Sequence, residues 1–268
     1  MITRAGKVAR FRALHQAGCF VMPNPWDAAG ARLLAGLSFK ALATTSSGYA
    51  HSIGLRDGAA EISLDLKLIH FAAIANATDL PVNADTEDCY GQSADEIAET
   101  VRLVAEAGAS GLSIEDRWPG GPEAFRSRAD AFERVGAAVE AALRHNIVLT
   151  ARADGLLTSH YDLDEAIFRL QAFEKLGAEV VYAPGLRDLA GLTRVCAEVK
   201  VPVNHLAAPG IAGASIAELA KAGVRRISVG GGLARAMGGE MMRLCQTIQD
   251  GNFAALESAP RWKDIGGA

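Results

Sequence analysis

Short segments rich in apolar residues recur along the chain, and each is followed by a segment whose apolar residues have helical spacing. The short segments are almost continuously apolar, which is typical of parallel strands that are buried on both faces. Glycine ends several helical segments just before the next strand, as at 107–109 and 176–178. The pattern predicts eight strands, at 19–22, 40–45, 80–84, 111–114, 147–151, 180–183, 201–206 and 226–229.

Eight strand-then-helix units predict an α/β fold, a (β/α)8 TIM barrel that forms a single domain over residues 1–268. A doubly wound open sheet is the main alternative. Residues 1–15 are expected to form an amphipathic N-terminal helix. Ser93 and Glu96 form a capping-box pattern at the start of the helix that follows the third strand. Residues 46–63 are interpreted as a long polar loop.

The chain continues beyond the eighth unit, which is expected to end near Ile248. Phe253, Leu256 and Trp262 follow in a C-terminal helical extension, and these apolar side chains need a surface to cover. We therefore expect residues from about 231 to 268 to take part in the contacts of a homo-oligomer, either a dimer or a tetramer.

Composition narrows the class of protein. Hydrophobic residues make up 50% of the 268 residues and aromatic residues 6%, so Ala, Leu, Val and Gly form the core. A net charge of −4 without a basic run argues against nucleic-acid binding. No apolar run reaches the roughly 18 residues of a membrane span. Four scattered cysteines form no CxxC pair. We expect a reduced cytoplasmic protein that binds neither nucleic acid nor membranes.

Three carboxylates lie within four residues at the end of the third predicted strand, namely Asp85, Glu87 and Asp88. They would repel one another in a dry site, so they either lie in water or share a cation. Asp85 and Glu87 are two residues apart and would point to the same side of an extended chain. Such hard oxygen ligands suit Mg²⁺ or Mn²⁺, which take one or two carboxylates directly and keep several waters. A solvated acidic turn is the alternative.

In a barrel of this kind the active site lies at the C-terminal ends of the strands. Arg152 at such an end offers a planar fork for a carboxylate or phosphonate, or else forms a structural ion pair. Backbone N–H groups of Ser46–Gly48 could face an oxyanion, and Gly230–Gly232 suits phosphate. Other polar residues at predicted strand ends are Asn24, Trp26, Glu115, Asn204 and His205.

Taken together, these segments resemble the isocitrate lyase/phosphoenolpyruvate mutase superfamily over nearly the whole chain. The segments are Pro-Asn-Pro-Trp-Asp (23–27), Thr-Thr-Ser-Ser-Gly (44–48), Leu-Arg-Asp-Gly (55–58), Pro-Val-Asn-Ala-Asp-Thr-Glu (81–87) with Tyr90 and Gly91, Ile-Glu-Asp (114–116), Ala-Arg-Ala-Asp (151–154) and Ile-Ser-Val-Gly (227–230). The resemblance implies a barrel, Mg²⁺, a small 2-oxo or 2-hydroxy acid substrate and an enolate-like intermediate. It also implies exchange of the last barrel helix between subunits.

The resemblance implies roles for individual residues. Asp85 matches the direct metal ligand, and the residues that match those holding the metal's waters are Asp57, Glu87 and Glu115. The implied catalytic residues are Arg152, Glu115, Ser46, Gly48 and Tyr49. The implied substrate-binding residues are Trp26, Ser46, Ser47, Gly48, Tyr49, Arg152 and Asn204.

The segment after Glu115 departs from the family pattern. Isocitrate and methylisocitrate lyases carry a Lys-Lys-Cys-Gly-His loop there, whereas this chain has Asp-Arg-Trp-Pro-Gly-Gly-Pro-Glu (116–123). The lack of Cys and His argues against those two activities, and the polar loop of phosphonopyruvate-acting members is also missing. We expect the loop of residues 116–128 to act as a cover, with Trp118 as its apolar part. His51 and His205 are candidate proton carriers.

The leading functional interpretation is a Mg²⁺-dependent lyase or decarboxylase that cleaves a C–C bond in a 2-oxo or 2-hydroxy (di)carboxylic acid through an enolate. Carbon–phosphorus chemistry on a phosphonopyruvate-like acid, by a mutase or hydrolase, is an alternative. Phosphosugar chemistry at Gly230–Gly232 is a further one, which the acidic cluster disfavours. A non-catalytic 2-oxo acid binder is the last.

Overall fold

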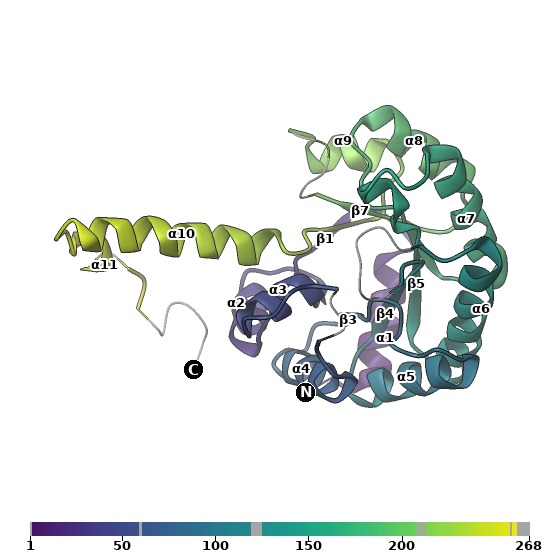
Figure 1. Cartoon of the computed structure of the whole chain (residues 1–268), viewed down its shortest axis with the longest axis horizontal. Coiled ribbons are helices and arrows are strands. Elements are labelled where there is room, and N and C mark those ends of the chain that lie inside the picture. Colours follow the sequence, from purple (N-terminus) through teal and green to yellow (C-terminus); the bar gives the residue numbers. More distant parts are fainter. Residues whose placement is uncertain are drawn as a thin grey trace.

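Eight short parallel strands form the centre of the molecule (Figure 1). The computed structural model describes residues 2–58, 61–118, 125–207, 211, 213–257 and 259–261. The strands are β1 (Phe20–Met22), β2 (Leu42–Ala43), β3 (Val82–Asp85), β4 (Gly111–Glu115), β5 (Val148–Arg152), β6 (Val180–Tyr182), β7 (Val203–Leu206) and β8 (Arg226–Ser228). Their order is β1-β8-β7-β6-β5-β4-β3-β2. The N–H of Ala43 donates to the carbonyl of Pro23 at 3.1 Å, which nearly closes the ring.

Helices surround this barrel and follow the strands in sequence (Figure 1). They are α1 (Arg4–Leu14), α2 (Ala28–Gly36), α3 (Ser46–Ser52), α4 (Leu64–Asn76), α5 (Ala94–Glu106), α6 (Arg128–Arg144), α7 (Leu163–Leu176), α8 (Leu189–Glu198), α9 (Ile216–Lys221), α10 (Gly232–Gln249) and α11 (Ala254–Glu257). The predicted (β/α)8 barrel is confirmed, together with its N-terminal helix and its C-terminal helical extension. The capping box of Ser93 and Glu96 is present at the start of α5.

The interpretation of residues 46–63 as one polar loop is wrong at its start, because α3 occupies Ser46–Ser52. The side chain of Thr45 caps this helix and accepts a hydrogen bond from the N–H of Gly48 at 3.2 Å. Serine and glycine are poor helix formers, so the sequence pattern concealed the helix. Its position at the strand ends matters for the site, since α3 presents backbone amides to the barrel.

The N-terminal helix α1 closes the end of the barrel at which the strands begin. Val8 and Phe11 of α1 are fully buried. They share a hydrophobic cluster with the first residues of three strands, Phe20, Val148 and Val180. This packing fills the end of the barrel at which the strands begin and leaves the opposite end, where the strands finish, as the place for a ligand.

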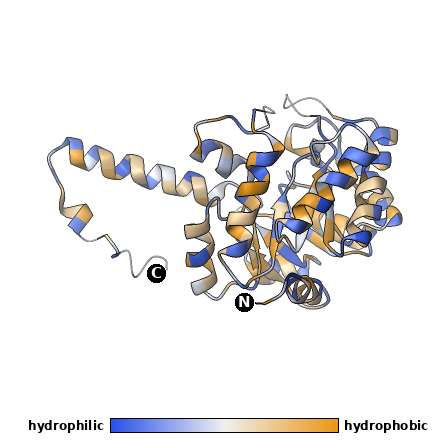
Figure 2. Cartoon of the chain, turned by 90° about the horizontal axis from the view of Figure 1, so that it is seen from below, coloured by the Kyte–Doolittle hydropathy of each residue, from blue (hydrophilic) through white to orange (hydrophobic). Residues whose placement is uncertain are grey.

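The last long helix behaves differently from the others, because α10 extends away from the barrel (Figures 1 and 2). None of its residues is buried, and α11 has no buried residue either. Met237, Met241 and Met242 of α10 are all well exposed, as is Phe253. Trp262, which belongs to the predicted extension, lies outside the described residues. No helix in the described ranges is long and apolar enough to cross a membrane.

We predict that His15 makes the fold sensitive to acid. Its side chain is 5% exposed, and Nε2 lies 3.5 Å from Nη1 of Arg226. Burial, with the nearby charge of Arg226, lowers the pKa of His15 to about 3 from an ordinary 6.5. Because the folded pKa is depressed, this contribution to stability is complete above pH 6.5 and is lost as the pH falls from there toward 3.

The variant His15→Gln removes this titration. Between pH 6.5 and pH 4 its free energy of unfolding should fall less steeply than that of the wild type, by about 1.4 kcal/mol per pH unit. Urea unfolding at several pH values measures the two slopes. Parallel slopes for the two proteins would show that His15 does not titrate in this way.

Candidate active site

A cavity of about 950 Å³ opens at the end of the barrel where the strands finish. The residues that line it include the last residues of β3, β4, β5 and β6, namely Asp85, Glu115, Arg152 and Tyr182. The structure brings most of the sequence-predicted site residues together here: Ser46, Ser47, Gly48, Asp57, Asp85, Glu87, Glu115, Arg152 and Asn204.

Two predicted substrate-binding residues do not line this cavity. The ring of Tyr49 stacks on that of His70 at 3.9 Å, and its hydroxyl donates to the carbonyl of Leu66 at 3.4 Å. Trp26 is also absent from the cavity wall, and its carbonyl oxygen lies 2.9 Å from Nε2 of His70. The sequence marked both residues by their position after a strand. It did not show that the Tyr49 side chain packs on His70 or that Trp26 lies outside the cavity wall.

Arg152 is the centre of the polar network at the cavity mouth. Its Nε and Nη2 donate to the two carboxylate oxygens of Asp154 at 3.0 and 2.7 Å. Its Nη1 contacts Asp85 at 3.1 Å and Glu115 at 2.8 Å. One guanidinium therefore joins carboxylates that follow or end β3, β4 and β5. Burial raises the pKa of Glu115 well above its ordinary value, and the charge of Arg152 opposes this shift.

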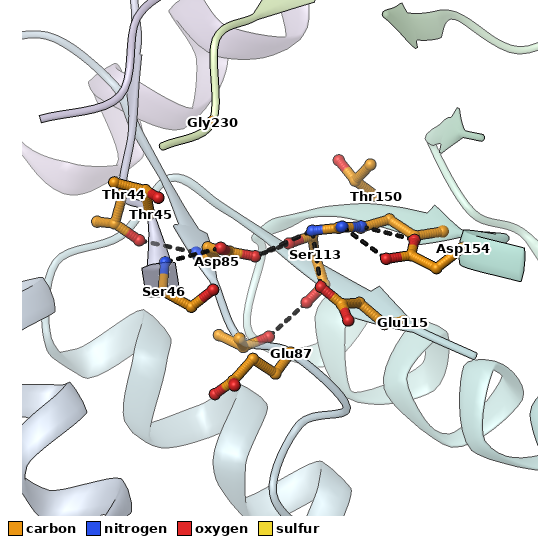
Figure 3. A network of polar contacts seen from close by, with 12 residues as sticks. Thr44, Thr45, Ser46, Asp85, Glu87, Ser113, Glu115, Thr150, Asp154 and Gly230 are labelled. Carbon is orange, nitrogen blue, oxygen red and sulfur yellow. Dashed lines mark hydrogen bonds and ion pairs between the residues drawn. The ribbon is translucent and has the colours of Figure 1, made fainter. Parts of the chain in front are cut away.

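Asp85 is fixed by groups from three elements. Its own N–H donates to Oγ1 of Thr44 at 2.8 Å, next to β2. The N–H of Ser46 at the start of α3 donates to Oδ2 of Asp85 at 2.9 Å, and the hydroxyl of Ser113 on β4 donates to Oδ1 at 3.4 Å (Figure 3). The carboxylate is thereby held at the cavity wall, where a ligand could reach it.

Asp85 and Glu87 both line the cavity, but the prediction that an extended chain carries them to the same side is wrong, because the chain is not extended at Glu87. Strand β3 ends at Asp85, and Glu87 adopts a left-handed backbone conformation with φ of 48°. Its carboxylate forms an ion pair with Lys67 of α4. The Lys67 ammonium also lies 4.2 Å from the centre of the Tyr90 ring.

Lys67 is a cavity residue that the sequence did not reveal. A lysine in a helical pattern normally lies on the exposed face, yet this side chain is buried and lines the cavity. Burial lowers the pKa of Lys67, and the surrounding carboxylates, Asp85 first among them, raise it. The only signal in the sequence was the position of Lys67 four residues after Ser63, on the face of α4 that also carries Phe71 and Ile74 toward the core.

Asp88, the third carboxylate of the acidic stretch, is buried and held by two arginines, so its role is structural. It forms ion pairs with Arg126 at 2.8 Å and Arg134 at 3.3 Å, and all three side chains are almost completely buried. Arg134 also donates to the carbonyls of Asp88 and Gly91 at 2.7 Å each. These contacts tie the loop after β3 to α6.

The segment after β4 is anchored at its base. The N–H of Arg126 donates to the carbonyl of Asp116 at 3.0 Å, and Arg117 and Phe125 form an antiparallel bridge. The guanidinium of Arg126 lies 4.0 Å from the centre of the Trp118 ring, and Trp118 lines the cavity. Residues 119–124 of the predicted cover (116–128) lie outside the described residues.

The two histidines proposed as proton carriers differ in position. His51 lines the cavity, whereas His205 is buried and does not. Burial lowers the pKa of His205. Cys89 is fully buried, and burial raises the pKa of its thiol to about 12, so it is a packed side chain and no reactive thiolate.

The donor atoms fit the Mg²⁺ that the superfamily implies. Asp57, Asp85, Glu87 and Glu115 all line the cavity and offer only hard oxygen atoms. Burial, and then the charge of Asp85, raises the pKa of Asp57, so a cation here would relieve real repulsion. No three acidic, histidine or cysteine side chains converge on one point among the described residues. An ion here would therefore be bound directly by one or two carboxylates at most, and waters would complete its shell.

With this geometry established, comparison with known proteins identifies the family. The family model named phosphoenolpyruvate phosphomutase matches residues 11–249. The chain therefore belongs to this family, within the isocitrate lyase/phosphoenolpyruvate mutase superfamily. A crystal structure of a protein provisionally assigned as a lyase/mutase, from Burkholderia cenocepacia J2315, is 44% identical with a TM-score of 0.92. It covers 98% of this chain and 95% of its own.

Curated relatives are also similar to this chain. An uncharacterized protein of Mycobacterium tuberculosis is 32% identical over 82% of this chain and 81% of its own length. The 2-methylisocitrate lyase of Escherichia coli K12 is 34% identical, over 58% of this chain and 53% of that enzyme. The oxaloacetate decarboxylase of Pseudomonas entomophila is 27% identical, over 72% of this chain and 68% of that enzyme. The relatives with named activities are thus enzymes.

We predict that Asp88 stabilises the fold and that its loss is costly. Asp88→Asn leaves two buried guanidiniums without their shared carboxylate, so the free energy of unfolding should fall by roughly 3 kcal/mol. Urea unfolding at pH 7 measures the change. The matched control is Asp95→Asn on the exposed first turn of α5, which should cost only a few tenths of a kcal/mol. Equal stability of the two variants would contradict the structural role.

Proposed function

We propose that this protein is a Mg²⁺-dependent lyase or decarboxylase that cleaves a C–C bond in a small 2-oxo or 2-hydroxy (di)carboxylic acid. The observation that carries the proposal is the network at the strand ends, where Arg152 meets Asp85, Glu115 and Asp154 beside the amides of α3. The named relatives support this class, because one is a 2-methylisocitrate lyase and another an oxaloacetate decarboxylase.

In this proposal Asp85 would bind the metal ion directly, and Asp57, Glu87 and Glu115 would hold its waters. A bound Mg²⁺ supplies positive charge that stabilises an enolate oxygen. Arg152 is pre-aligned by its bidentate contact with Asp154, so it loses little freedom when it holds a substrate carboxylate. Because its Nη1 is shared between Asp85 and Glu115, the substrate has to compete with both for that donor.

Backbone and hydroxyl groups of α3 would orient the substrate. Ser46, Ser47 and Gly48 line the cavity, and Gly48 has little spare room, because an added Cβ would lie 2.6 Å from the side chain of Thr45. A larger residue there would push α3 out of place. Tyr49 and Trp26, which do not line the cavity, would act by supporting α3 and not by touching the substrate.

Two alternative functions are each favoured by a specific observation. Carbon–phosphorus chemistry on a phosphonopyruvate-like acid is favoured by the name of the matched family model. A non-catalytic 2-oxo acid binder is favoured by the cavity wall, because none of its described residues is a cysteine that could replace the acid of the missing loop. Turnover of oxaloacetate or substituted malates with Mg²⁺, read as pyruvate or glyoxylate, would support the lyase. Phosphate release from phosphonopyruvate would support the first alternative, and binding without turnover the second.

We predict that Asp85→Ala weakens the binding of Mg²⁺ with oxalate by more than about tenfold and abolishes metal-dependent turnover. The reason is that Asp85 is the only carboxylate proposed to contact the metal directly. Isothermal calorimetry measures the binding, and circular dichroism checks that the variant is folded. Asp65→Ala, an exposed aspartate on the first turn of α4, is the matched control and should bind like the wild type. Wild-type binding by Asp85→Ala would refute the ligand assignment.

We also propose a homo-oligomer, a dimer or tetramer, in which α10 packs against another copy of the chain. The supporting observation is that no residue of this 18-residue helix is buried, although it carries Met237, Met241 and Met242.

We also propose a cytoplasmic location, because four free cysteines suit a reducing compartment.

We predict that Met241→Glu combined with Met242→Glu shifts the protein toward monomer, since a charge in an apolar interface is expensive to bury. Light scattering at micromolar concentration measures the mass. Leu143→Glu, a similar change at an exposed position of α6, serves as the control and should leave the mass unchanged. A monomeric wild type would refute the oligomer.

A further inference from the structure

A second arginine, Arg226, lies at the floor of the same cavity. It occupies the first position of β8 and is the largest fully buried side chain in the described chain, with 2% exposure. Its Nε donates to Oδ1 of Asn204 at 2.8 Å, and its Nη2 donates to Oγ1 of Thr150 at 3.0 Å. Its Nη1 lies 3.5 Å from Nε2 of His15, which accepts as a neutral ring.

Among the described residues, the hydrogen-bond partners of Arg226 are all uncharged, in contrast to those of Arg152. Arg152 has three carboxylates around it, whereas no described carboxylate forms an ion pair with Arg226. Burial lowers the pKa of Arg226 to about 9, so the guanidinium still carries its charge at neutral pH. A buried charge without a counter-ion is costly. A buried positive charge of this kind at the floor of a cavity favours the binding of an anionic ligand.

A chain of hydrogen bonds leads from Arg226 toward the cavity space. Asn204 accepts from Arg226 and donates through Nδ2 to Oγ of Ser228 at 2.9 Å. Ser228 is in turn hydrogen-bonded to the side chain of Tyr182. All four residues line the cavity. Because each donor polarises the next in a low-dielectric interior, the positive charge of Arg226 strengthens the donors above it.

We propose that Arg226 is a specificity-determining residue of this cavity: through the hydrogen-bonded side chains of Asn204 and Ser228, its buried charge favours a ligand that carries a second carboxylate. Arg226 thereby makes the cavity selective for diacids over monoacids. This inference rests on the proposed function only in that the ligand is a small 2-oxo or 2-hydroxy acid. Asn204 would then connect the charge of Arg226 to the ligand, because its amide accepts a hydrogen bond from Arg226 and donates one to Ser228.

The test compares malate with lactate, because malate is lactate with one added carboxylate. Binding of each acid in the presence of Mg²⁺ is measured by calorimetry, without any need for turnover. In Arg226→Met we expect malate binding to weaken by about tenfold or more, as loss of a buried unit charge at an effective dielectric near 20 implies. Lactate binding should change much less, so the preference for malate disappears. The loss should persist at high salt, because a buried charge is poorly screened.

Two companion variants separate binding from folding. Arg225→Met removes the neighbouring arginine, which is partly exposed and donates to the carbonyl of Gly18 at 3.5 Å, and it should keep the wild-type preference for malate. Arg226→Lys keeps a charge and should restore part of that preference. The thermal midpoint of Arg226→Met should equal or exceed that of the wild type, because an uncompensated buried charge has been removed.

If Arg226→Met fails to fold, Asn204→Asp provides the second test, because it gives Arg226 an internal carboxylate. Malate binding should then weaken by about tenfold or more while lactate binding is largely kept. Wild-type selectivity in either folded variant would overturn the proposal, as would equal losses for malate and lactate, or a wild type that does not prefer malate. Absence of turnover with every acid would contradict the lyase proposal. It would not affect the test of Arg226, which depends only on the preference for binding malate over lactate.

Discussion

The ion-pair network of Arg152 is the interaction on which the mouth of the barrel depends. Strand register places Glu115 beside Arg152, so β4 and β5 end together, and Asp85 at the end of β3 lies beside Ser113, two residues before the end of β4. Carboxylates brought together in this way would raise one another's pKa and push the strand ends apart. A single guanidinium, aligned by Asp154, offsets that repulsion at three strand ends together. The acidic site can therefore exist in a buried position before any ligand arrives.

Arg152 at the mouth of the cavity and Arg226 at its floor have opposite electrostatic surroundings. At the mouth the charge of Arg152 is more than balanced by carboxylates, which favours a cation there. At the floor the charge of Arg226 has no acidic partner among the described residues, which favours an anion. A small acid that chelates a metal with one end and carries a second carboxylate at the other matches both levels. Selectivity would then come from the length and charge of the acid, in addition to its reacting bond.

Much of the fold could be predicted because the local signals agree with one another. Helix α7 ends at Leu176, as the glycine in 176–178 predicts, since Asp162 caps its first turn and Gly177 ends it with φ of 106°. Helix α3 could not be predicted in the same way, because its stability comes from the Thr45 cap and from contacts with the barrel. The direction of Glu87 was equally hidden. Glu87, Cys89 and Tyr90 all have positive φ, and tertiary contacts hold that tight turn against its local cost.

The candidate site could be predicted only where chemistry coincides with a strand end. Asp85, Glu115 and Arg152 satisfy that condition, and the structure places all three at the cavity mouth. Lys67 and Arg226 do not, because one lies within a helix and the other begins a strand. A signal for Arg226 was nevertheless present, since side chains two apart on a strand point to the same side. Ser228 lines the cavity, so Arg226 must face the barrel interior as well, and only an anion or a set of polar partners can make that position tolerable.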